Sequence, residues 1–416
     1  MQPYQPTSQL GWIDFSDSSR KKMLKVLEAL NGKGTIDELG IGSIRNAFSN
    51  KLFPATSVLM TRAKYYLFIP YILKDFLKDK TATDAKKYLE QEERWLVSQF
   101  VDKLDSQQLN GSGIIGYTIY QKSKRLAAQP PSTVYWGGIR KLRIYQGESS
   151  LANYLEQLNK LKKEQYILEQ NPNSQTGIDD KNDNEDPSLL SIPSEPQWKD
   201  QLSMDLTENE QNFLTHKIKD LPQESLFGYL LSSNLLEDPA INLDSIRLLE
   251  AALVEHQKKH DVPASILKTL HHANRFWEVI RGAHLLYNVV LHRRSGVEEI
   301  TKKMWVEWQE EMKNLDWENF NIEWFWATVS EETRIDINTR FFVDTWFEKA
   351  KAGDFNYDEL AILVEKQERR IKGKRAKLLN IRGHRYTEEQ GLAFMEFRFG
   401  NAKRLIEDLI KSPVNA

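Results

Sequence analysis

Apolar residues recur every three or four positions through most of this 416-residue chain, which is the spacing of one face of an α-helix. Leu151, Leu155 and Leu158 form one such stripe, and the longest pattern extends over about residues 264–293. Strand-like alternation is scarce. The chain is therefore predicted to be mainly α and multi-helical, with at most a small β element near residues 133–146.

One segment, residues 171–200, differs in composition from the rest of the chain. It is rich in Asn, Asp, Ser and Pro and poor in large apolar residues. Such a segment cannot bury enough surface to order itself, so an acidic flexible linker or long loop is predicted. It divides the chain into an N-terminal helical region, residues 1–170, and a C-terminal helical region, residues 201–416. The second region opens with a capping box from Thr207 to Glu210, which predicts the start of a helix.

The bulk composition limits the chemistry and the location of the protein. The chain has no Cys, so disulfides and thiolate metal sites are excluded. Its start lacks a charged segment followed by an apolar run, and its longest apolar run, Tyr65–Leu73, is too short to span a bilayer. These features predict a cytoplasmic protein. Five tryptophans between Trp305 and Trp326 are predicted to build an aromatic core.

Positive charge is concentrated in two segments, although the net charge of the whole chain is only −2. Residues 106–147 contain no Asp or Glu, and their cations are Lys122, Lys124, Arg125, Arg140, Lys141 and Arg143. Residues 366–385 contain the single acid Glu368, and their cations are Lys366, Arg369, Arg370, Lys372, Lys374, Arg375, Lys377, Arg382 and Arg385. The segments carry +6 and +8, so the other residues together carry −16.

Cations interleaved with aromatic rings are typical of proteins that bind nucleic acids, because phosphates attract the cations and bases stack on the rings. We expect the six cations of the first segment to contact phosphates of DNA or RNA, and Tyr135 and Trp136 to stack on bases. The C-terminal basic segment would extend this track. Two competing interpretations are that the cations pair with the acidic linker or a partner protein, and that they are simply solvated.

Sequences that match catalytic or cofactor motifs lack the surroundings that their chemistry needs. Residues 111–116 match G-x-G-x-x-G, but no strand-like stretch precedes them and no acid follows until Glu148, so a glycine-rich turn is predicted. His256 and His260 are four residues apart, but residue 257 is not the glutamate of a zinc protease. They are interpreted as surface histidines. The sequence predicts no catalytic residue, no cofactor and no metal site.

A family resemblance is carried by four N-terminal stretches, Leu10–Ser16, Asp37–Ser49, Leu52–Ser57 and Thr61–Phe68. Their residues resemble those of DUF6361, an uncharacterised bacterial family. The resemblance continues more loosely at residues 375–380 and 397–399. It implies a bacterial protein of anti-phage defence loci, encoded beside helicase and phospholipase-D-like nuclease genes. It implies no assigned activity.

Two arginines of these N-terminal stretches, Arg45 and Arg62, lie near predicted turns. Arginines beside helix starts can bind a phosphate or carboxylate, so the pair is a possible anion site. The favoured alternative is that they fix the turns by pairing with an acid such as Asp14 or Asp37.

The function expected from these observations is that of a non-enzymatic accessory subunit of a bacterial, anti-phage defence-type system. Such a subunit would bind nucleic acid, or dock to a helicase or nuclease partner that does. The first alternative is a protein-protein scaffold without nucleic-acid contact. The second alternative is an unrecognised hydrolase.

Overall fold

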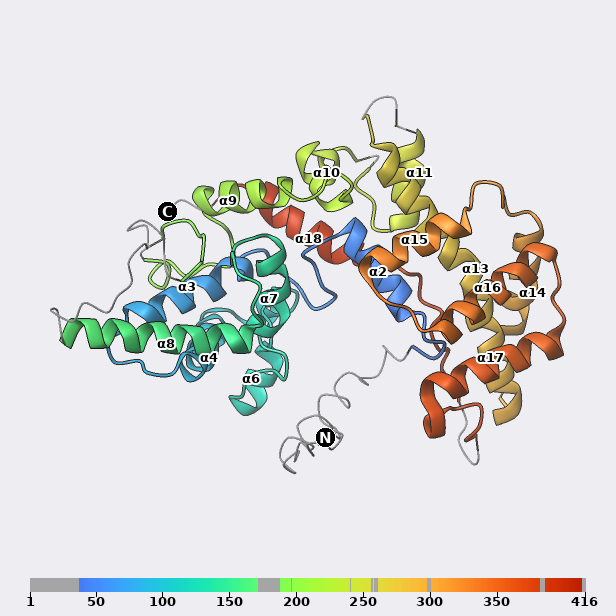
Figure 1. Ribbon diagram of the computed structural model, residues 1–416, viewed down its shortest axis with the longest axis horizontal. Helices are drawn as coiled ribbons and strands as arrows, with labels where there is room; N and C mark the ends of the chain where they lie inside the picture. Colours follow the sequence, from blue (N-terminus) through green and yellow to red (C-terminus); the bar gives the residue numbers. More distant parts are fainter. Residues whose placement is uncertain are drawn as a thin grey trace, which may run out of the picture.

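The computed structural model describes residues 37–170, 188–195, 197–239, 241–255, 257, 261–297, 301–381 and 386–413. Within these residues the protein is mainly α, as the periodicity predicts, and no β-sheet forms. A single isolated antiparallel bridge joins Tyr145 to Leu190. Figure 1 shows two groups of helices, here called the N-terminal and C-terminal lobes, on either side of a central group.

The N-terminal lobe is organised around α3, whose residues are buried over most of its length. Helix α3 packs against α4 and α7, and α4 also packs against α6 and α8. The helices of this lobe are α3 (Tyr65–Lys78), α4 (Ala85–Lys103), α5 (Ser106–Leu109), α6 (Tyr117–Ser123), α7 (Pro131–Lys141) and α8 (Leu151–Gln170).

The C-terminal lobe is organised around the long helix α13, which contacts α11, α14, α16, α17 and α2. Helix α2 comes early in the chain but packs here, against α13 and α15. The helices of this lobe are α2 (Gly42–Leu52), α11 (Ile246–Glu255), α13 (Ala264–Ser295), α14 (Thr301–Lys313), α15 (Ile322–Glu332), α16 (Ile337–Ala352), α17 (Tyr357–Lys372) and the 3₁₀ turn η2 (Gly373–Arg375).

Tryptophans form much of the interior of the C-terminal lobe, as predicted. Trp308 is fully buried, stacks on Trp305 with ring centroids 5.0 Å apart, and lies 5.8 Å from Trp346. Its indole N–H donates to the carbonyl of Glu278 at 2.8 Å. The polar edge of the ring is therefore satisfied, while its faces supply apolar packing.

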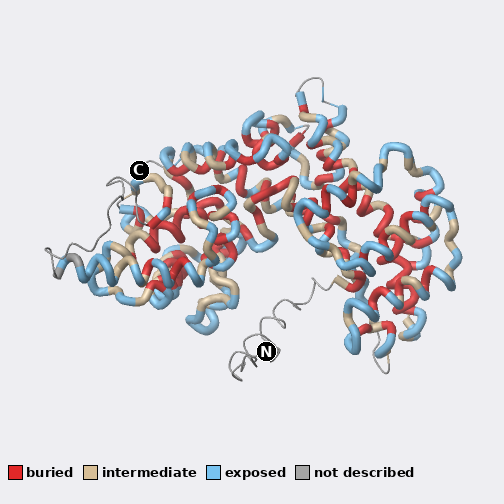
Figure 2. The backbone as a smooth tube through the Cα atoms, viewed as in Figure 1, coloured by how far each residue is buried: buried red, intermediate tan, exposed pale blue. Residues whose placement is uncertain are grey.

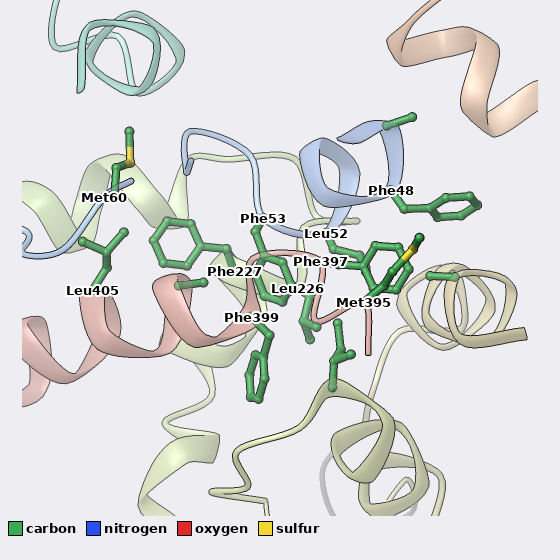
Figure 3. Packing of buried hydrophobic residues seen from close by; sticks show 14 of the residues in the cluster. Phe48, Leu52, Phe53, Met60, Leu226, Phe227, Met395, Phe397, Phe399 and Leu405 are labelled. Carbon is green, nitrogen blue, oxygen red and sulfur yellow. The ribbon is translucent and has the colours of Figure 1, made fainter. Parts of the chain in front are cut away.

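The central group joins the two lobes and brings residues from early in the described chain against residues near 400. It consists of α9 (Glu208–Lys219), α10 (Leu226–Ser232), the 3₁₀ turn η1 (Leu235–Glu237) and α18 (Phe399–Ile410). Phe53 packs on Phe399 with ring centroids 6.0 Å apart, and Phe48 packs on Phe397 at 6.3 Å (Figure 3). Buried residues occur in both lobes and in these central helices (Figure 2).

The sequence predicts at most a small β element near residues 133–146, and within the described residues only the isolated bridge at Tyr145 forms there, because most of this stretch is α7. Helix α7 begins with Pro131, which suits the first turn of a helix. Its buried residues include Tyr135 and Ile139, which are four residues apart, a spacing that places both side chains on one face of either a helix or a strand. Gly138 faces the interior, where an added Cβ would lie 2.4 Å from the carbonyl oxygen of Ala55.

The described part of the predicted linker is packed against the N-terminal lobe. The side chain of Trp198 is 8% exposed and contacts Phe68, Tyr71 and Trp95 at ring-centroid distances of 5.6 to 6.0 Å. Residues 171–187 and 196 lie outside the described residues. The division into two regions stays a prediction. Helix α2 belongs to the N-terminal region by sequence but packs in the C-terminal lobe.

Candidate nucleic-acid interface

The first basic segment is divided between the two ends of α7. Lys122, Lys124 and Arg125 lie at the end of α6, just before α7 begins, and all three are exposed. The ammonium group of Lys124 lies 4.8 Å from the centre of the Tyr120 ring. These cations are free to meet an anion, since none of them forms an ion pair within the described residues.

At the other end of α7, the remaining cations line a groove with a volume of about 860 Å³. Arg140, Lys141 and Arg143 come from α7 and the residues after it, and Lys217 comes from α9. The Lys217 ammonium donates to the carbonyl of Arg143 at 3.3 Å, which joins the two walls. Sequence reading missed Lys217, because nothing in the chain connects it to a segment more than seventy residues earlier.

Two acids also line the groove, and both are exposed. Glu148 accepts a hydrogen bond from Arg140 at 2.9 Å, but its side chain is 97% exposed. Asp220 lies 3.0 Å from His216, and its side chain is 62% exposed. Exposed ion pairs contribute little free energy, so a polyanion can displace them. The Nε of Arg140 is buried without a hydrogen-bond partner in the described part of the chain.

The exposed face of α7 connects the two basic groups. Thr133, Gly137 and Lys141 are four residues apart and all exposed, so they lie along one side of the helix. An added Cβ at Gly137 would meet nothing within 4 Å. The sugar-phosphate backbone of a nucleic acid can therefore approach this face of α7 closely. Eleven residues of helix extend about 16 Å, roughly five base-pair steps of duplex DNA.

The stacking role expected for Tyr135 and Trp136 is wrong, because both rings belong to the core. Tyr135 is fully buried, and its hydroxyl donates to the carbonyl of Arg62 at 2.8 Å and accepts from the N–H of Thr61 at 2.8 Å. Trp136 is 5% exposed and stacks on Tyr154 at 5.1 Å. Neither ring can reach a nucleobase.

The second basic segment lies in the other lobe, on α17 and η2 (Figure 1). Five of its cations are exposed and form no ion pair within the described residues: Lys366, Arg369, Arg370, Lys374 and Arg375. We call these five residues the α17 surface. Arg382 and Arg385 lie outside the described residues.

Lys372 and Lys377 of the same segment have an internal role. Both pair with Glu38, a carboxylate that is 1% exposed, at 3.4 and 2.8 Å. Lys377 also donates to the side-chain oxygen of Gln390 at 2.7 Å. The expectation that these two lysines bind nucleic acid is therefore wrong, because they neutralise a buried acid.

Arg62 pairs with acids of the protein and is not available to a ligand. This is the outcome expected from the alternative in which the arginines pair with an acid. Its Nε donates to Asp408 at 2.9 Å, and its Nη2 donates to Asp205 at 2.9 Å. Burial alone would lower the pKa of Arg62, but these two carboxylates raise it above its ordinary value. Arg62 therefore stays charged and joins the N-terminal lobe to α18.

The acids that bind Arg62 differ from those expected, and Arg45 is not part of this contact. Asp37 accepts hydrogen bonds from the N–H groups of Ile41 and Gly42 at the start of α2, and Asp14 lies outside the described residues. Arg45 lines a separate cleft. The two arginines are thus not brought together at one anion site.

The glycine motif at residues 111–116 forms a turn, as predicted. Gly111, Gly113 and Gly116 have φ values of 85°, 80° and 83°, which side chains rarely allow. Thr61 donates to the carbonyl of Gly113 at 2.6 Å. His256 and His260 lie outside the described residues. No group of three or more metal-ligating side chains occurs in the described ranges.

The sequence matches the model of a family of unknown function, DUF6361, over residues 7–412. The chain belongs to the DUF6361 family. No curated protein and no solved structure matches it. The match to DUF6361 spans both lobes and the central group, so the basic groove and the α17 surface both lie within the family's region. Among the described helices, none is both long and apolar enough to cross a membrane.

Proposed function

We propose that this DUF6361 protein is an accessory subunit that binds nucleic acid through the phosphate backbone. The contact begins at the end of α6, follows the exposed face of α7 and continues into the basic groove. The observation that carries this proposal is the convergence of Arg140, Lys141 and Arg143 with Lys217, four cations from two distant parts of the chain, beside only two exposed acids.

The available side chains favour phosphate contacts over base recognition. The two rings that could have stacked on bases are buried, and the exposed face of α7 offers small residues and cations. Lysine and arginine contacts to phosphates carry no sequence information. Binding should therefore be largely independent of sequence and should weaken strongly as salt increases.

The α17 surface provides a second region of positive charge in the other lobe. A ligand long enough to reach both lobes would gain affinity from two contacts on one chain. Short oligonucleotides would occupy only one of them. Affinity should thus rise with the length of the nucleic acid.

The salt dependence of binding tests the proposal. Fluorescence anisotropy with labelled single- and double-stranded oligonucleotides, between about 50 and 200 mM salt, should give a steep loss of affinity. The triple substitution Arg140→Ala, Lys141→Ala and Arg143→Ala should weaken binding about a hundredfold and reduce the slope of log affinity against log salt by about three.

A matched control removes the same charge elsewhere in the N-terminal lobe. Lys86, Lys87 and Lys103 of α4 are exposed, and changing them to Ala should alter the affinity by less than about threefold. An isotherm that barely changes with salt, or equal losses for the two triple variants, would rule out the groove as the binding surface.

Neutralising the predicted linker distinguishes a nucleic-acid binder from a scaffold. Asp179, Asp180, Asp183, Glu185 and Asp186 can be changed to their amides, which keeps the length of the chain. If these acids satisfy the basic segments, the variant will gain nucleic-acid binding that the parent lacks. A native binder will bind before the change. The helicase or nuclease partner implied by the resemblance is tested by a pull-down with and without nuclease treatment.

A further inference from the structure

A second cleft, separate from the basic groove, lies where α2, α13 and the start of α18 meet. Its volume is about 660 Å³, within the range of small-molecule sites. Arg45 of α2, His284 of α13, and Arg398 and Arg404 at the start of α18 all line it. These residues are far apart in sequence, and the fold brings them together.

The three arginines of this cleft form no ion pair with a carboxylate in the described part of the chain. Arg398 donates from Nη1 to the side-chain oxygen of Asn50 and to the carbonyl of Thr56, both at 2.8 Å and both neutral. Arg404 donates from Nε to the carbonyl of Gly400 at 3.2 Å. Neither they nor Arg45 form an ion pair within the described residues. Burial lowers the pKa of Arg398 and the charge of Arg45 lowers it further, while the charge of Glu332 partly opposes the shift.

The acids of the cleft are already used by other groups. Asp37 accepts the N–H groups at the start of α2, and Asp244 pairs with Lys403 at 2.6 Å. Glu396 accepts the N–H of Ile246 at 2.8 Å. Hydrogen bonds from N–H groups leave the negative charges of Asp37 and Glu396 in place, so the three arginines exceed these two carboxylates by one positive charge. Gathering like charges in a partly buried site is costly unless an anion neutralises them.

His284 presents an unused polar group to the same cleft. Its side chain is 4% exposed, and neither ring nitrogen has a hydrogen-bond partner in the described part of the chain. Burial lowers its pKa to about 4, so the ring is neutral at pH 7 and offers one donor and one acceptor. Gly391 passes directly over it, since an added Cβ there would lie 2.6 Å from Nδ1.

The backbone beside these side chains is strained. Phe397 and Arg398 are consecutive non-glycine residues with φ values of 46° and 72°. Such conformations are uncommon and costly for side chains of this size, and they concentrate where a function requires them. Here the strained turn directs Arg398 toward Asn50 and Thr56 and places it on the cleft wall.

We propose that this cleft binds a phosphate group, with Arg45, Arg398 and Arg404 as its cationic ligands and His284 as a neutral hydrogen-bonding partner for an adjacent uncharged polar group. A phosphate monoester carries more charge than a single carboxylate and offers several acceptor oxygens to guanidinium groups. The source of the phosphate is either a small molecule such as a mononucleotide or the phosphorylated end of a nucleic acid.

Calorimetric titration with inorganic phosphate and AMP tests this site. Saturable binding of either probe with a Kd below about 1 mM is expected. Arg404→Ala, which alters an exposed side chain, and Arg45→Ala should each weaken it about tenfold or more. Arg94→Ala, which removes an exposed arginine of α4, should leave it unchanged. If neither probe saturates, or if the cleft variants bind as the parent does, the proposal is wrong.

Two further measurements are needed. One distinguishes a nucleic-acid end from a small molecule as the source of the phosphate, and the other distinguishes the cleft from the basic groove. A 5′-phosphorylated oligonucleotide that binds more tightly than its 5′-hydroxyl counterpart, with the difference lost in Arg45→Ala, assigns the site to nucleic-acid ends. An AMP affinity without that difference assigns it to a small molecule. The groove variant with Arg140, Lys141 and Arg143 changed to Ala should bind AMP normally, so failure at one surface leaves the other intact.

Discussion

The two basic segments look alike in sequence, yet the structure uses them differently. The cations of the first segment lie around α7, and none of them pairs with a buried acid in the described residues, whereas two of the second segment, Lys372 and Lys377, neutralise the buried Glu38. Lys377 and Glu38 are 339 residues apart. A cluster of cations in a sequence therefore cannot be assigned to a ligand until it is known which acids, distant in sequence, lie beside it in the fold.

The largest effect expected from this comparison concerns stability. Lys377→Ala should lower the free energy of unfolding by about 3–5 kcal/mol, because it leaves the buried Glu38 with only the longer contact to Lys372. Urea unfolding measures the change. Lys374→Ala, three residues away and exposed, is the control and should change stability by less than about 0.5 kcal/mol. Equal stability of the two variants would show that Lys377 has no internal role.

A smaller, pH-dependent effect is expected beneath the first segment. Glu93 is 2% exposed and accepts the N–H of Ser132 at the start of α7 at 2.6 Å. Burial raises its pKa from 4.5 to about 7. The folded protein therefore holds this proton more tightly than the unfolded chain, and the contribution of Glu93 to stability decreases as pH rises from about 4.5 to 7.

The substitution Glu93→Gln removes this titration and keeps an acceptor for Ser132. At pH 8 the variant should be more stable than the parent by about 2 kcal/mol, and at pH 4 the two should differ little. Thermal unfolding across this pH range measures the difference. A constant offset at every pH would mean that ionisation of Glu93 is not responsible.

The smallest effects distinguish the two faces of α7. Gly137→Ala should stabilise the protein by up to about 1 kcal/mol, because alanine favours the helix and its Cβ meets open space. Gly138→Ala should destabilise it, since the Cβ would clash with the carbonyl of Ala55. Chemical denaturation of both variants measures the contrast. The same sign for both would contradict the orientation of α7.

The features of the fold that the sequence could predict are those set by local chemistry. The capping box is present, with Thr207 accepting the N–H of Glu210 and Glu210 accepting the N–H of Thr207. The tryptophans of the C-terminal lobe are largely core residues, and the glycine motif forms a turn. Each of these outcomes depends on neighbours a few residues apart, which a pattern along the chain contains.

The features that sequence reasoning missed depend on tertiary packing. Tyr135 and Trp136 have the composition of a stacking platform, but they lie on the inner side of α7. Lys217 joins the groove only because α9 lies beside the end of α7. His284 lies within the apolar pattern of a long helix, and no local signal in the sequence distinguishes it from a core histidine. Only the packing reveals that its ring lacks partners.

The contact between Arg62 and Asp408 has a consequence for biosynthesis. The two residues are 346 positions apart, and Asp408 also accepts the N–H of Ala63 at 2.7 Å. Domains usually fold in the order in which they are made. In this protein the residues of the N-terminal lobe leave the ribosome long before α18 has been translated, so the contact of Arg62 forms only after that helix has been made.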